Sequence, residues 1–98
     1  MPDFFVVQTP EGEKLFVNLD CVSDAWYGSI SGAPDEVRRK ATDKERVFVL
    51  YTKQLIGGER SQNYFWWAGM DADIVQQEFL KAVRNPQPMS LVLLPAHG

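Results

Sequence analysis

Residues 47–68 read VFVLYTKQLIGGERSQNYFWWA, with a β-forming run on each side of the Gly57-Gly58 pair. Two glycines between such runs predict a β-hairpin closed by a tight, primed turn. A two-residue loop also fixes the register, because Ile56 then lies opposite Glu59 and the numbers of every facing pair sum to 115. The four consecutive aromatic residues 64–67 therefore lie in the second strand of this hairpin.

Both faces of the predicted hairpin are apolar. A strand with one face in water alternates apolar and polar residues, and this alternation is lost here, so both faces need a cover. One face carries Phe48, Leu50, Phe65 and Trp67, and the other carries Val47, Val49, Tyr51, Tyr64, Trp66 and Ala68. One helix can cover one of these faces, and the sequence leaves open which. The second face, together with a tryptophan of the preceding strand, is the predicted interface or ligand surface: Trp26, Val49, Tyr51, Tyr64 and Trp66.

The flanking segments supply the other elements. Residues 4–8 and 14–18 form a hairpin around Pro10 and Gly12, and 22–27 form a third strand. Apolar residues recur at helical spacing from Asp71, the expected N-cap, to Arg84. The tail 86–98 contains an apolar run at 90–94 that is long enough for a short strand. The first hairpin also has two apolar faces, so a second cover is missing there as well.

Residues 28–46 form a long, charged excursion between the third strand and the 47–68 hairpin. Pro34, followed by acidic and then basic residues, predicts a short exposed helix over 34–41. We expect this helix to be too charged to cover much of a sheet. The basic run Arg38, Arg39 and Lys40 is either a solvated surface or a contact for an acidic partner.

These elements predict an α+β fold in one domain, 1–98. The expected architecture is an antiparallel sheet of five or six strands, made of two hairpins and a third strand. One C-terminal helix packs on it, or the sheet curls into a partly closed barrel. The uncovered apolar face favours a homodimer formed through that face or through exchange of the tail.

No catalytic or metal site is predicted, and no cofactor. His97 is the only histidine and lies near the chain end, while Cys21 is the only cysteine and is expected to be a small buried side chain. Turn and capping roles account for the paired aspartates. With ten basic and thirteen acidic residues the net charge is −3, which argues against nucleic acid as a partner. We expect no membrane span and no secretory signal, hence a cytoplasmic protein.

The run GEKLFVNLDCVSDAW, residues 12–26, ends a hairpin and passes through Asn18, Leu19 and Asp20 into another strand. This strand, Asn-x-Asp turn and strand resemble a pattern in the small bacterial flagellar FlbD-like family. The resemblance covers about fifteen residues, and it implies no function and no site residue for this chain.

The sequence thus favours a small, non-enzymatic protein-interaction module that self-associates. The alternative is a binder of a small apolar or aromatic ligand, held between sheet and helix by Trp26, Trp66 and Trp67.

Overall fold

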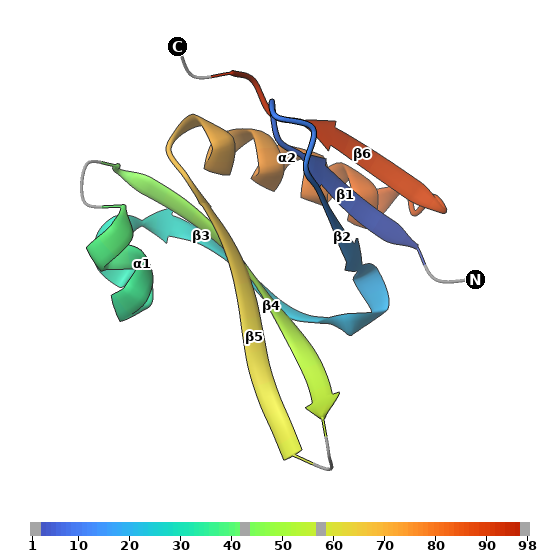
Figure 1. Cartoon of the computed structure of the whole chain (residues 1–98), viewed down its shortest axis with the longest axis horizontal. Coiled ribbons are helices and arrows are strands. Elements are labelled where there is room, and N and C mark those ends of the chain that lie inside the picture. The colour runs from blue at the N-terminus through green and yellow to red at the C-terminus, as the bar shows by residue number, and fades with distance from the viewer. Residues whose placement is uncertain (1–2, 42–43, 57–58, 97–98) are drawn as a thin grey trace.

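The computed structural model describes residues 3–41, 44–56 and 59–96 and is an α+β fold with two three-stranded sheets (Figure 1). We call the sheet with strand order β2-β1-β6 sheet A and the sheet with order β3-β4-β5 sheet B. The strands are β1 (Phe4–Gln8), β2 (Lys14–Asn18), β3 (Val22–Ser29), β4 (Arg46–Ile56), β5 (Glu59–Ala68) and β6 (Met89–Leu93). The helices are α1 (Asp35–Lys40) and α2 (Met70–Arg84), with short 3-10 turns η1 (Leu19–Cys21) and η2 (Ile30–Gly32).

Sheet B contains the glycine-flanked hairpin in the predicted register. Every β4–β5 pair from Val47–Ala68 to Ile56–Glu59 follows the expected sum. The primed turn predicted at Gly57-Gly58 lies outside the described residues. On the other side of β4, β3 pairs antiparallel only as far as Thr52, so the distal part of the hairpin continues as a two-stranded ribbon (Figure 1).

Sheet A corrects the prediction of one antiparallel sheet. The predicted first hairpin is present as β1 and β2, and the predicted 90–94 strand is present as β6. However, β6 runs parallel to β1, on the side opposite β2, and neither sheet closes into a barrel within the described chain. Parallel strands need a long connection that returns the chain to the starting end of the sheet. Here the chain leaves sheet A after β2, forms sheet B, and returns through α2.

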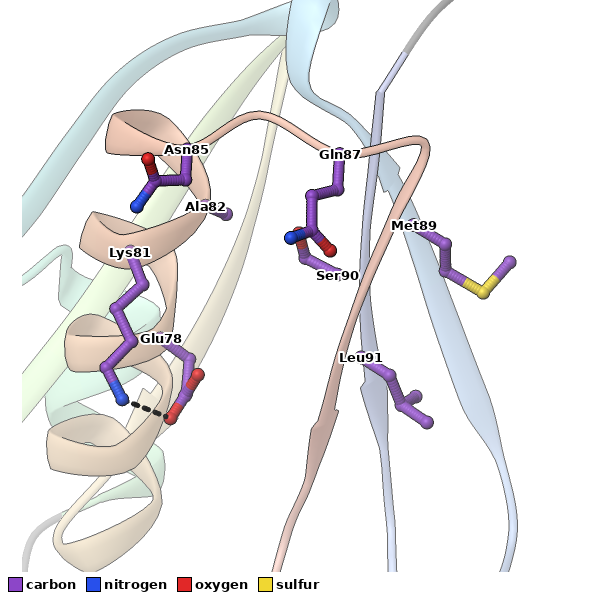
Figure 2. A pocket seen from close by; sticks show the side chains of 8 residues that line it. All are labelled: Glu78, Lys81, Ala82, Asn85, Gln87, Met89, Ser90 and Leu91. Carbon is purple, nitrogen blue, oxygen red and sulfur yellow. Dashed lines mark hydrogen bonds and ion pairs between the residues drawn. The ribbon is translucent and has the colours of Figure 1, made fainter.

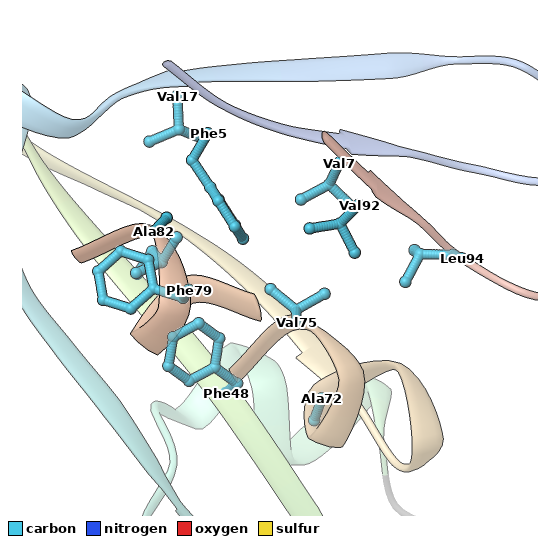
Figure 3. Packing of buried hydrophobic residues seen from close by; sticks show 11 residues of the cluster. Phe5, Val7, Val17, Phe48, Ala72, Val75, Phe79, Ala82, Val92 and Leu94 are labelled. Carbon is cyan, nitrogen blue, oxygen red and sulfur yellow. The ribbon is translucent and has the colours of Figure 1, made fainter. Parts of the chain in front are cut away.

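The main core lies where α2 meets both sheets. Phe79 of α2 contacts Phe5 of β1, with ring centroids 5.6 Å apart, and Phe48 of β4, at 5.7 Å (Figure 3). Around these rings pack the buried residues Val7, Val17, Leu50, Ala72, Val75, Ala82, Val92 and Leu94. One face of each sheet is thereby covered by the same helix.

The helix α2 starts earlier than expected. Its N-cap is Gly69, at φ 66° and ψ −134°, and the predicted cap residue Asp71 lies inside the first turn. Glycine adopts a positive φ without steric cost, so the chain can turn sharply from β5 into the helix at this point.

A second core corrects the prediction that the charged segment covers little. Ala33, Val37 and Ala41 are 6%, 0% and 3% exposed and pack against Val47 and Val49 of β4. These three residues recur every four positions, so they share one side of α1 and its flanks while the charges point to solvent. The spacing, and not the overall charge, decides what this short helix can bury.

Candidate functional site

The outer face of sheet A is the side turned away from α2. Side chains alternate between the two faces of a strand, and Phe5, Val7, Val17 and Val92 all point into the main core. The residues of opposite parity therefore form the outer face, and the register aligns them in three rows: Asn18–Phe4–Met89, Phe16–Val6–Leu91 and Lys14–Gln8–Leu93. Six of these nine side chains are apolar and one is charged.

Four large apolar side chains on this face are exposed to solvent. Phe16 and Met89 are each 54% exposed, Leu91 is 50% exposed and Leu93 is 64% exposed. Three of the four lie on one strand, β6, at the edge of sheet A. A cluster of this kind on a small domain marks an interaction surface more often than a scattered single leucine does.

The edge of β6 also presents backbone groups. The Leu94 N–H donates to the Gln8 carbonyl, and the Pro88 carbonyl accepts from the Phe4 N–H. In a parallel ladder alternate residues turn to opposite sides, so the even-numbered residues of β6 bond to β1. The N–H and C=O groups of Met89, Leu91 and Leu93 consequently point away from sheet A.

A surface cavity of about 310 Å³ lies beside this edge, between β6 and the C-terminal half of α2. Lys81 and Glu78 form an ion pair of 3.3 Å on its helical wall. Figure 2 shows Ser90 directed toward the helix side, with Met89 and Leu91 directed away from it. The cavity is lined by Glu78, Lys81, Ala82, Asn85, Gln87, Met89, Ser90 and Leu91.

The surface predicted from the sequence lies elsewhere, beneath α1. Val49 is fully buried, and Trp26, Tyr51, Tyr64 and Trp66 are half-buried around it in the second core. The structure thus brings all five together, but α1 and η2 occupy much of the face that was expected to be open.

A hydrogen bond fastens α1 to this face. The Tyr64 hydroxyl donates to Glu36 Oε2 at 2.6 Å. This bond, together with Lys40, holds the pKa of Glu36 below its ordinary value, and the same bond raises the pKa of Tyr64. At neutral pH Glu36 is therefore ionised and Tyr64 is neutral, and the hydrogen bond between them holds α1 against sheet B.

The basic run of α1 is exposed. Arg38 pairs with Asp35, and Lys40 pairs with Glu36 at 2.9 Å. Arg39 lies between them and is exposed as well. Partial neutralisation within the helix leaves a weaker positive surface than three basic residues in a row suggest.

A second polar cluster joins sheet B to the start of α2. Arg46 contacts both carboxylate oxygens of Asp73 at 3.0 Å, and the Tyr27 hydroxyl donates to the same carboxylate at 2.5 Å. The bonds from Arg46 and then Tyr27 lower the pKa of Asp73, while the bond to Asp73 raises the pKa of Tyr27 and that of Arg46. The carboxylate of Asp73 accepts all of these hydrogen bonds, so the cluster has a structural role. We call Tyr27, Arg46 and Asp73 the brace between sheet B and α2.

The described residues contain no group of three or more side chains able to hold a metal ion. Cys21 was expected to be buried and is exposed instead, because η1 turns the chain at the surface between β2 and β3. His97 lies outside the described residues. None of the helices in the described ranges is long and apolar enough to cross a bilayer.

The three tryptophans of the predicted ligand pocket are separated by sheet B. Trp26 and Trp66 pack in the second core, whereas Trp67 packs against the main core on the opposite face. Its ring lies beside that of Phe48, with centroids 6.2 Å apart. The three tryptophans therefore do not line one pocket.

The exposed residues Phe16, Met89, Leu91 and Leu93 were not among the predicted site residues. Two signals in the sequence pointed to them: the first hairpin is apolar on both faces, and residues 85–96 contain no charged side chain. What the sequence did not show is that 89–93 forms an edge strand next to 4–8.

Comparison of the chain with protein-family models, with curated proteins and with solved structures gave no match. The short resemblance to the flagellar FlbD-like family has no support beyond its fifteen residues.

Proposed function

We propose that the protein is a small, non-enzymatic interaction module that self-associates through sheet A. The observation that carries the proposal is the group of four exposed apolar side chains on the outer face, Phe16, Met89, Leu91 and Leu93, in a sheet whose other face packs on the main core. A cytoplasmic location and the lack of enzymatic activity stay predictions from the sequence.

The free energy gained by burying these side chains is comparable to the cost of association. Burying one large apolar side chain completely stabilises by roughly 1.5–3 kcal/mol, and each of these four is about half exposed. Two copies would together gain roughly 6–12 kcal/mol before costs, against about 4–15 kcal/mol for lost translational and rotational freedom. The surface therefore suits a reversible dimer that also needs polar contacts.

The test is sedimentation velocity of the purified chain from micromolar to millimolar concentration. We expect a concentration-dependent shift from the 11.2 kDa monomer to the dimer. Leu91→Lys should abolish the shift, because it places a charge between the exposed side chains of Met89 and Leu93 on β6. The matched control is Leu80→Lys, which changes a leucine of α2 that is 41% exposed and lies outside sheet A.

A wild-type chain that stays monomeric over the whole range would refute the proposal. Equal loss of the dimer in both lysine variants would also count against it, because the effect would then not belong to sheet A.

A further inference from the structure

Neighbouring strands decide how well an outer-face side chain is buried in sheet A. Val6, in the middle strand, has Phe16 on one side and Leu91 on the other and is 1% exposed. Leu91 occupies the same row but has a neighbour on one side only, and it is 50% exposed. One additional strand beside β6 would give Leu91 the surroundings that Val6 already has.

The backbone of β6 also lacks a neighbouring strand on the side away from β1. Met89, Leu91 and Leu93 turn their N–H and C=O groups away from β1, toward the position of that additional strand. Edge strands in natural proteins are commonly protected by charges, prolines within the strand, or bulges. The sequence of β6, MSLVL, contains no charge and no proline, and its register with β1 is continuous.

We propose that the additional strand is β6 of a second copy, paired antiparallel about a two-fold axis at Leu91. Two copies of sheet A then form one six-stranded sheet with both α2 helices on the same side. This inference rests on the proposed function and specifies which part of sheet A makes the contact.

The register follows from the free backbone groups. With the axis at Leu91, the facing pairs are Leu91–Leu91 and Met89–Leu93, and each is a pair that exchanges two hydrogen bonds. Three such pairs form across the axis. An axis at Ser90 or Val92 leaves only two pairs of outward-facing residues, so the register at Leu91 satisfies the most groups.

Side chains on both faces tolerate this pairing. On the outer face, leucine meets leucine and methionine meets leucine, with no charge among them. On the other face, the wall of the neighbouring cavity carries Glu78 and Lys81, one charge of each sign. A two-fold related copy therefore brings no excess of like charge to the axis.

The first experiment separates edge pairing from packing of outer faces. Leu91→Pro removes an N–H that points away from β1, which an edge strand tolerates, and should eliminate the dimer in sedimentation velocity. Phe16→Lys places a charge on β2, at the opposite edge of sheet A, and should weaken the dimer less than Leu91→Pro does. Leu80→Lys changes an exposed leucine of α2 outside sheet A and should leave the dimer intact. Far-UV circular dichroism and thermal melting check that all three variants fold.

The second experiment tests the register without relying on proline. In a Cys21→Ser background, Leu91→Cys should form an interchain disulfide on mild oxidation, because facing Cα atoms in such a pair lie about 5.5 Å apart. Leu93→Cys should not, because residue 93 of one copy lies about four residues from residue 93 of the other, or roughly 13 Å. Non-reducing electrophoresis at a concentration that dimerises the wild type gives the readout.

The outcomes distinguish the two proposals. A wild-type dimer that survives Leu91→Pro but is lost in Phe16→Lys overturns edge pairing and leaves self-association through the outer face. Crosslinking of Leu93→Cys in place of Leu91→Cys overturns the register. A wild-type monomer overturns both proposals.

Discussion

Phe79 is the side chain through which α2 joins the two sheets, and truncating it tests that arrangement. Phe79 is 8% exposed and its ring meets Phe5 edge-on and Phe48 at a tilt. Replacing a buried phenylalanine by alanine costs about 3–5 kcal/mol, and each aromatic pair adds about 0.5–1.5 kcal/mol beyond burial. We therefore expect Phe79→Ala to lie near the upper end, at about 4–5 kcal/mol.

A leucine at the same position separates volume from ring contacts. Phe79→Leu keeps most of the apolar volume but loses both ring pairs, so its cost should be about 1–3 kcal/mol. With a urea m-value of about 2 kcal/mol per M, the unfolding midpoint should fall by about 2 M in the alanine variant and about 1 M in the leucine variant.

The assay is urea unfolding followed by tryptophan fluorescence, at one protein concentration for all variants. Leu80→Ala is the matched control: it is the next residue of α2, is 41% exposed, and should cost about 0.5 kcal/mol or less. If Phe79→Ala loses no more stability than Leu80→Ala, the sheets do not meet through Phe79 and the description of the main core is wrong.

Three further changes test other parts of the fold. Val37→Ala should destabilise by about 1–3 kcal/mol in the same urea assay, and a cost within error of zero would restore the view that the charged segment covers nothing. The pKa of Asp73 is lowered mainly by Arg46, so the brace stabilises above the unfolded pKa and is lost as the pH falls through the folded one. The urea midpoint should thus decrease as the pH is lowered from about 5 to about 2, and the decrease should be smaller in Asp73→Asn. An equal decrease in the wild type and in Asp73→Asn would show that this ion pair does not stabilise the fold. Gly69→Ala places a Cβ at φ 66° and should lower the melting temperature by at least about 4 °C, whereas an unchanged melting temperature would contradict the positive φ.

Local patterns predicted most of the elements and one complete register. The glycine pair fixed the facing residues of β4 and β5 because a two-residue loop leaves no freedom in the count. Strands β1 and β2 followed from the apolar runs on each side of Pro10 and Gly12, and helix α2 followed from apolar periodicity. In each case the signals lie within a few residues.

The arrangement of the sheets depended on contacts between distant residues. Nothing local to 89–93 shows that it pairs with 4–8, so the division into two sheets and the parallel pairing could not be read from the sequence. The burial of α1 was missed differently: its apolar residues 33, 37 and 41 were outweighed by counting charges, although their spacing was visible.

The surface predicted from the sequence is less open than expected, for the same two reasons. Because α1 covers Val49 and its neighbours on sheet B, the apolar face that stays exposed to solvent is the outer face of sheet A. Both hairpins are apolar on two faces, so an uncovered face was expected on each. The pairing of β6 with β1 is what shows that the exposed residues lie on sheet A.

The parallel pairing of β1 with β6 has a consequence for how the chain folds. Val6 and Leu91 are partners although 85 positions separate them, so sheet A is completed by closing a loop that contains sheet B and α2. Such non-local contacts slow folding, and during synthesis β1 must wait for β6 before it can pair with it. Until residue 93 has been made, β1 exposes an unpaired edge next to Phe4 and Val6, and unpaired strand edges of this kind favour aggregation.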